Sequence, residues 1–273
     1  MSEQVSRRAM VAGLLLLAFA TPAGSPAPGS PLLPPELRDL WPEGMVVARG
    51  TRSVVVGHHA APGSLDEMAR RADTAGQRVA AVLGGPVRPL VVVPRTTREA
   101  AELAGVARLD GLAAVADGGR VIVVPEFFAM LNPTGKDVVL IHELAHVVAG
   151  TDRLPVWLYE GFADYVGYRD AGLPVKTAAA ELAAEVRAGH VPSELPGPAA
   201  FAADGRDPVR LARAYQEAWL ACRFLADRFG EETLVGLYRD ARAIGVDQAL
   251  ASLGLSVATL TARWRDYVRD QLA

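Results

Sequence analysis

The segment that most constrains this chain is residues 142–146, which read His-Glu-Leu-Ala-His. On an α-helix, side chains four positions apart lie on the same face, so the rings of His142 and His146 can converge on one ion. Glu143 lies beside them, where a carboxylate can take a proton from a water at that ion. A catalytic zinc takes three protein ligands and leaves a fourth position to water. The spacing therefore predicts a helix that carries a site for one Zn²⁺ ion.

The residues on both sides of this motif predict that the helix is buried. Asp-Val-Val-Leu-Ile leads into it at 137–141 and Val-Val-Ala leaves it at 147–149, so the helix is apolar nearly all round. The alternative is a chance match, in which both histidines are ordinary polar-face or core residues. The chain has only 5 His among 273 residues, and two histidines and a glutamate are costly on a buried helix unless they are hydrogen-bonded or ligated. These observations favour zinc binding.

A second segment supplies a candidate third ligand. Residues 155–165 read Pro-Val-Trp-Leu-Tyr-Glu-Gly-Phe-Ala-Asp-Tyr, and Pro155 favours the start of a helix that carries Glu160 and Asp164 one turn apart. The large apolar side chains around Glu160 indicate a helix packed inward, where an unpaired carboxylate is expensive. We therefore expect Glu160 to be a ligand rather than a surface acid. Asp164 is either the acceptor for the ring N–H of a ligand histidine or an ordinary surface charge.

Together the two segments resemble the gluzincin peptidases, and most closely the bacterial peptidase MA-like proteins, whose second motif reads Trp-Leu-x-Glu-Gly-x-Ala. The resemblance is strong over residues 142–165 and loose over residues 45–270. It implies a zincin-like fold and zinc ligands His142, His146 and Glu160. It also implies that Glu143 is the general base of a metallopeptidase that hydrolyses peptide bonds in a peptide or protein substrate with a zinc-activated water.

The same resemblance suggests two further functional features. Tyr215 is the candidate that stabilises the oxyanion in the transition state, although a core tyrosine is the alternative and His190 is a second candidate for the role. The strand around Ala114, Val115 and Ala116 is a candidate edge on which an extended peptide binds by strand addition. Ala116 stands where gluzincin aminopeptidases carry an amine-binding glutamate, which argues against a strict aminopeptidase.

Two rival interpretations are open to test. Another zincin clan places its third ligand six residues after the second histidine, where Asp152 stands, but Ala149 replaces the glycine of that motif and no methionine follows Met130. The second rival is a non-catalytic, exported zinc-binding module that keeps the peptidase fold. The presence of Glu143 argues against it, because a structural zinc site needs no base and fills its fourth position with protein.

The N-terminus predicts export. Residues 1–20 carry Arg7-Arg8, an apolar run over 9–20 and a small-x-small cleavage pattern at 18–20, which together are typical of a signal peptide. The double arginine resembles a twin-arginine signal, and the alternative is an N-terminal membrane anchor. The run is short for a membrane span, so we expect no stable membrane insertion after cleavage. Residues 21–40 are rich in Pro and Gly and are predicted to be a disordered tether.

Composition excludes some partners. A net charge of -3 with 22% charged residues gives no basic field for nucleic acid. Arginine outnumbers lysine, which stands only at 136 and 176, and this bias suggests a bacterial source with a GC-rich genome. The single cysteine, Cys222, permits no internal disulfide.

The pattern along the chain predicts an α+β fold, zincin-like, with a small mixed or antiparallel sheet followed by an all-helical C-terminal half. Residues 41–170 are expected to form the catalytic half and residues 171–273 the helical half that completes the cleft. Expected strands lie at 46–48, 53–56, 90–93, 112–116 and 120–124, the last two joined by Asp-Gly-Gly in a hairpin. Expected helices lie near 64–83, 134–149, 209–229, 232–244 and 256–272.

Overall fold

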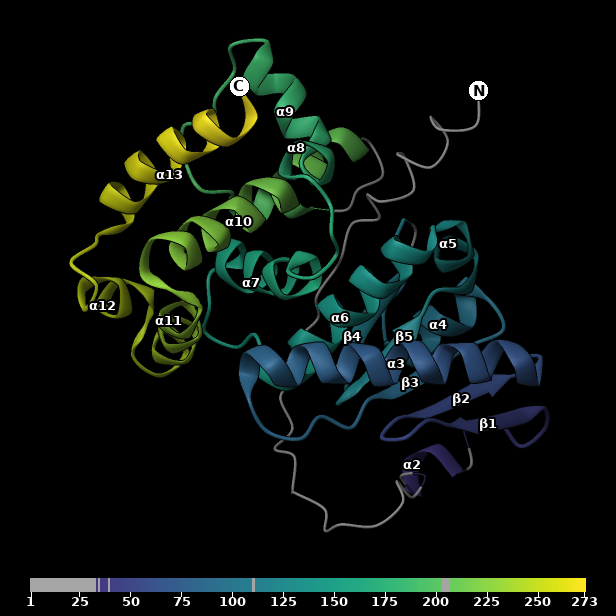
Figure 1. The fold of residues 1–273 in the computed structure, drawn as a ribbon. Coiled ribbons are helices and arrows are strands. Elements are labelled where there is room, and N and C mark those ends of the chain that lie inside the picture. Colours follow the sequence, from purple (N-terminus) through teal and green to yellow (C-terminus); the bar gives the residue numbers. More distant parts are fainter. Residues whose placement is uncertain (1–32, 34, 39, 110, 203–206) are drawn as a thin grey trace. The chain divides into compact units, whose positions relative to one another are not determined.

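The computed structural model describes residues 33, 35–38, 40–109, 111–202 and 207–273 (Figure 1). The predicted signal peptide, residues 1–20, lies outside these, as does most of the predicted tether, residues 21–40. At the end of that segment Pro35–Arg38 forms the short helix α2, in which Leu37 is buried. Within the described part of the chain, no helix has both the length and the apolar character needed to cross a membrane. The chain divides into two compact units between Gly150 and Thr151.

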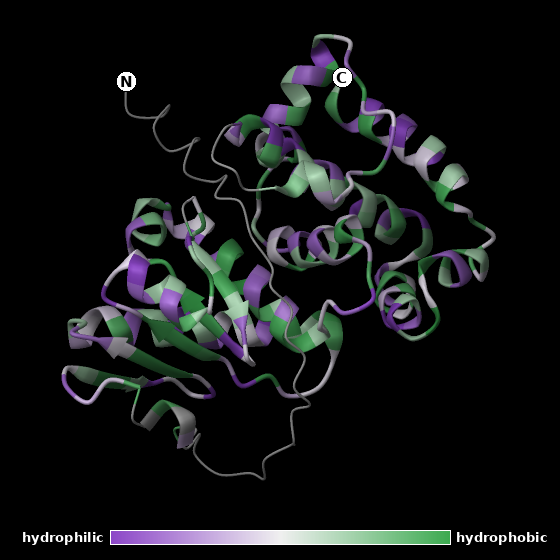
Figure 2. Cartoon of the chain, turned by 180° about the vertical axis from the view of Figure 1, so that it is seen from behind, coloured by the Kyte–Doolittle hydropathy of each residue, from purple (hydrophilic) through white to green (hydrophobic). Residues whose placement is uncertain are grey.

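The first unit is built on a mixed five-stranded sheet with the strand order β1-β2-β3-β5-β4. β1 pairs antiparallel with β2, β2 and β5 run parallel to β3, and β4 pairs antiparallel with β5. The strands are strongly hydrophobic (Figure 2), as expected for a sheet covered on both faces. Their bounds are Met45–Arg49, Val54–His58, Leu90–Val93, Ala114–Asp117 and Arg120–Val123 for β1 to β5.

Successive side chains of a strand point to opposite faces, and the two faces of this sheet have different covers. Helices α3 (Pro62–Leu83) and α6 (Pro133–Ala149) pack side by side, with α3 against β1 and β2 and α6 against β4 and β5 (Figure 1). The opposite face carries a buried cluster that includes α2 and α4 (Thr97–Leu103). Its buried members are Leu37, Trp41, Val54, Val56, Val92, Ala100, Ala101, Leu109, Leu112, Val115, Ile122 and Val124.

Two turns fix the register of this sheet. Gly118 and Gly119 join β4 to β5 with φ of 54° and 81°, as a two-residue type I′ turn requires. The β1–β2 turn is held from α3 by Asp73, whose carboxylate accepts hydrogen bonds from the backbone N–H groups of three successive residues, 51–53, at 2.6, 2.9 and 2.9 Å. Burial opposes ionisation of Asp73, but these backbone hydrogen bonds, with a contribution from the Ser53 side chain, outweigh it and lower its pKa.

The second unit is helical, and its centre is the pair α7 and α10, which pack along one another. Both helices carry small residues at the crossing, which allows their backbones to approach closely. The α+β fold class with a mixed sheet followed by helices is thus confirmed. The bounds are Val156–Tyr168 for α7, Val175–Ala178 for α8, Ala180–Arg187 for α9, Pro198–Phe201 for the 3₁₀ turn η1, Pro208–Phe229 for α10, Glu231–Ile244 for α11, Val246–Ala251 for α12 and Val257–Leu272 for α13; α5 of the first unit is Pro125–Met130.

Candidate metal centre

The two histidines of the motif lie on α6, as the spacing predicts. Asn132 caps this helix by accepting a hydrogen bond from the backbone N–H of Gly135 at 2.7 Å, and Gly150 ends it. The Nε2 atoms of His142 and His146 are 2.8 Å apart, and the rings meet edge to face with centroids separated by 4.6 Å. Both side chains are buried. The helix therefore directs two imidazole nitrogens to one point.

Glu143 follows the first histidine on the same helix, and its side chain is fully buried. Burying a carboxylate is costly unless charge or hydrogen bonds compensate for it. A bound cation next to it supplies such compensation. Its position thus agrees with the predicted role beside the metal.

Glu160 lies on α7, whose N-cap is Pro155, and only 1% of its surface is exposed. The charge of Glu160 contributes to the raised pKa of two tyrosines. Burial, followed by the charge of Glu160, raises the pKa of Tyr159 to about 12. Burial is also the first cause of the raised pKa of Tyr238, with Glu160 among the further contributors. Glu160 is therefore a buried carboxylate among aromatic side chains and not a surface acid.

One group of three metal-ligating side chains stands out among the described residues. His142, His146 and Glu160 each offer a ligand atom, and these atoms all lie within 4.8 Å of one another. Two imidazole nitrogens and one carboxylate form a donor set that catalytic zinc uses, and three protein ligands leave a fourth position to water. The buried triad fits a zinc ion in chemistry, number and order along the chain. It agrees with the gluzincin pattern.

Asp164 lies one turn after Glu160 on α7 and is buried. Burial, and after it the charge of Asp164, raises the pKa of the Cys222 thiol. The same two causes, in the same order, lead the rise in the pKa of Tyr168. The surface-charge alternative for Asp164 is thus disfavoured, and its contact with a ligand histidine stays a prediction.

The rival ligand Asp152 has a different environment. It lies in the turn before α7 and is paired with Arg242 of α11, with about half of its side chain exposed. A carboxylate held by an arginine at the surface does not need a metal to compensate its charge. The part of the chain that the structure describes contains no metal-ligand group that includes Asp152.

The two candidates for oxyanion stabilisation also differ. Tyr215 is buried on α10, and its ring meets Phe201 edge to face at 5.0 Å. His190 is 74% exposed and pairs with Glu185 at 3.1 Å. Burial favours Tyr215, because a hydrogen bond to a developing charge is stronger away from water.

The candidate substrate strand is placed as expected. β4, which contains Ala114, Val115 and Ala116, stands at one end of the strand order and pairs with β5 alone among the described strands. An edge strand offers backbone N–H and C=O groups to an extended peptide. Substrate binding there stays a prediction.

Sequence reasoning attached no role to Gly161, which follows the ligand glutamate. A Cβ at this position would lie 2.1 Å from the carbonyl oxygen of Ala218 and 3.0 Å from the Sγ of Cys222, both on α10. Only glycine lets α7 approach α10 so closely. The Glu-Gly pair in the motif was the available signal, but its partner lies 57 residues further along the chain (218 − 161).

No family model and no curated protein matches this chain. Among solved structures, it is similar to a point mutant of the M1 zinc metallopeptidase from Deinococcus radiodurans, with 19% identity and a TM-score of 0.45. It is likewise similar to that mutant bound to a Tyr-Ser-Ala substrate, with 18% identity and a TM-score of 0.45, and to the M1 zinc metallopeptidase itself, with 21% identity and a TM-score of 0.43. Each match covers 84% of this chain and 51% of the other, so the chain spans about half the length of these proteins.

Proposed function

We propose that this protein is a zinc-dependent peptidase. The observation that carries the proposal is the group His142, His146 and Glu160, three buried side chains whose ligand atoms lie within 4.8 Å of one another. Glu143, buried on the same helix as the histidines, adds the base that hydrolysis requires and a structural zinc site does not.

The residues have separate roles in this proposal. His142, His146 and Glu160 hold the ion, and Asp164 orients one of the histidine rings through its second nitrogen. Zinc, when bound, acts as a Lewis acid that makes water more acidic and the scissile carbonyl more electrophilic. Glu143 accepts the proton of the attacking water on its carboxylate and delivers it to the leaving amine. Tyr215 donates its phenol O–H to the oxygen on which negative charge develops.

The proposed substrate is a peptide or an exposed segment of a protein, bound in extended form along β4. This strand is at the edge of the sheet and packs against α6, the helix that carries the histidines. Export is a further part of the proposal and is supported by the N-terminal sequence. The signal is either cleaved after residue 20 or kept as a membrane anchor.

A direct experiment is to purify the full chain, measure its zinc content and incubate it with a peptide library whose products are identified by mass spectrometry. We expect about one zinc per chain, cleavage of peptide bonds, loss of cleavage when a chelator removes the metal, and recovery when zinc is returned. Zinc binding without cleavage of any library peptide would instead support the non-catalytic zinc-binding module. A protein that binds no zinc would contradict both.

A further inference from the structure

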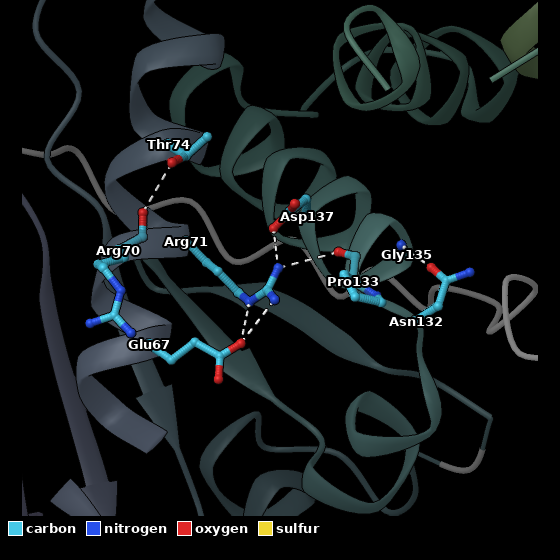
Figure 3. Close-up of polar contacts among 8 residues, drawn as sticks. All are labelled: Glu67, Arg70, Arg71, Thr74, Asn132, Pro133, Gly135 and Asp137. Atoms are coloured by element: carbon cyan, nitrogen blue, oxygen red, sulfur yellow. Dashed lines mark hydrogen bonds and ion pairs between the residues drawn. The ribbon is translucent and has the colours of Figure 1, made fainter. Parts of the chain in front are cut away.

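The guanidinium group of Arg71 joins two helices of the first unit (Figure 3). From α3, its Nε and Nη2 donate to Oε1 of Glu67 at 3.0 and 2.9 Å. Its Nη1 reaches α6, where it donates to Oδ1 of Asp137 at 2.6 Å and to the carbonyl oxygen of Pro133 at 3.3 Å. Only 19% of the Arg71 side chain is exposed. Arg71 is therefore held on α3 by the carboxylate of Glu67 and binds the first turns of the neighbouring helix α6.

The charge of this arginine is secure. Burial works against it, but the hydrogen bonds with Glu67 and then Asp137 more than compensate, and the pKa of Arg71 is raised. A guanidinium holds its donors in a rigid plane, so its contacts constrain direction as well as distance.

Such a directional contact matters for α6 because this helix is apolar nearly all round. Its buried side chains include Val138, Leu140, Ile141 and Leu144 as well as the histidines, and they point in many directions. Apolar burial is not directional, so it favours one rotation about the axis less strongly for a helix without a single hydrophobic stripe than for an amphipathic helix. A polar contact at a defined position can set that rotation.

Helical geometry links this contact to the metal ligands. At 3.6 residues per turn, His142 and His146 lie about 140° and 180° around the helix from Asp137. Arg71 thus binds α6 on the side opposite to the one that carries the two imidazoles. An atom about 5–6 Å from the helix axis moves about 1 Å when the helix turns by about 10°. That displacement is larger than the tolerance of about 0.2 Å in metal–ligand distances.

We infer that Arg71, braced by Glu67 and joined to Asp137, is a positioning residue that sets the rotation of α6 and thereby the geometry of the zinc site. The inference rests on zinc binding by the triad, as proposed above. It assigns no contact between Arg71 and the metal or substrate.

The test compares Arg71→Met with Arg98→Met in the full chain. Arg98 makes the same type of contact, an i,i+4 pair with Glu102 at 3.0 Å on α4, but it is 89% exposed and has no hydrogen bond or ion pair with a second helix among the described residues. For each variant three quantities are measured: the zinc dissociation constant by competition with a chelating dye, the visible spectrum of the cobalt-substituted protein, which reports ligand geometry, and the melting temperature without metal.

We expect Arg71→Met to weaken zinc binding about 10-fold, the lower end of the range for residues behind a ligand, and to change the cobalt spectrum. Arg98→Met should leave both as in the wild type. Arg71→Lys keeps the charge but lacks the planar fork, so it should resemble Arg71→Met. A variant Arg71→Met that melts earlier yet has the wild-type zinc affinity and cobalt spectrum would overturn the inference.

If Arg71→Met does not fold, the zinc affinity and the cobalt spectrum of Asp137→Asn are measured instead. This variant weakens the contact between Arg71 and Asp137 without changing the volume of the side chain. These readouts do not require turnover. A wild-type protein with the expected metal geometry and no peptidase activity would contradict the proposed function and leave the role of Arg71 intact, whereas a wild-type protein that binds no metal would overturn both.

Discussion

Gly161 of α7 lies against the backbone of Ala218 of α10, with no room for a side chain between the two helices. A Cβ at Gly161 would stand 2.1 Å from the carbonyl oxygen of Ala218. Backbone atoms cannot move aside as the end of a flexible side chain can, so the helices themselves would have to separate. This close approach fixes α7, the helix that carries Glu160.

Gly161→Ala should therefore destabilise the protein, by about 1–3 kcal/mol or more in the free energy of unfolding, as overpacked substitutions do. Denaturant unfolding measures this. Gly236→Ala on α11 is the matched control, because a Cβ there meets nothing within 4 Å and an alanine in a helix is favoured over glycine by roughly 0.5–1 kcal/mol. Equal changes in the free energy of unfolding of the two variants would contradict the close approach of α7 and α10 at Gly161.

The β1–β2 turn gives a prediction that depends on pH. The pKa of Asp73 is lowered in the folded protein, so its contribution to stability is present above the pKa of the unfolded chain and is lost as the pH falls through the lower, folded value. Asp73→Asn keeps the shape, removes the charge and replaces one of the two acceptor oxygens by an NH₂ group, which cannot accept a hydrogen bond. It should cost about 1 kcal/mol or more at neutral pH, because charged acceptors form stronger hydrogen bonds.

Melting temperatures of the wild type and Asp73→Asn, measured from pH 7 downward, test this. The difference should stay constant to about pH 5 and narrow below about pH 4, where the carboxyl of the unfolded chain becomes protonated. A difference that grows as the pH falls would contradict the proposed role.

Local patterns predicted the elements that carry the site. Asn132-Pro133 and Gly150 delimit α6 almost as expected, Pro155 precedes α7, and the Gly-Gly pair after Asp117 forms the predicted hairpin. In each case the physical cause is local: a cap, a fixed φ or a positive φ at glycine.

The start of α3 and the contacts between distant segments were not predicted correctly. The long helix expected near 64–83 begins two residues earlier, at Pro62 with Ala61 as its N-cap, and the Ser64 hydroxyl donates to the carbonyl oxygen of Ala61 at 2.8 Å. A proline suits the first turn of a helix, because its fixed φ is already helical and its missing N–H would have no partner within the helix there. The partners in contacts such as those of Arg71 with Asp137 or Gly161 with Ala218 could not be predicted from local patterns, because these contacts join segments more than 50 residues apart.

Glu143→Gln tests the general base. The variant keeps the shape of the side chain but cannot accept a proton, so it should retain zinc and lose hydrolysis by about 10²–10⁴-fold or more. Zinc content and cleavage rate are measured on the same preparation. Wild-type activity in this variant would contradict the mechanism.

Tyr215→Phe tests the oxyanion donor. Phenylalanine keeps the ring that meets Phe201 edge to face, so folding and zinc content should change little, while kcat falls about 10²-fold. His190→Ala serves as the comparison and should leave kcat unchanged, since this side chain is exposed and paired with Glu185. If the two variants exchange these effects, the role belongs to His190.

The third ligand is tested by removing two acids that imply different zincin clans. Glu160 is buried and has ligand atoms of His142 and His146 within 4.8 Å, so Glu160→Ala should purify with much less than one zinc per chain and without activity. Because metal binding stabilises the folded protein, the rise in melting temperature on adding zinc should also disappear. Asp152 is paired with Arg242 near the surface, and Asp152→Ala should keep its zinc and activity with a loss of no more than about 1 kcal/mol in the free energy of unfolding. Metal analysis of the two purified variants decides between the clans, because the opposite pair of results would make Asp152 the ligand and overturn the gluzincin assignment.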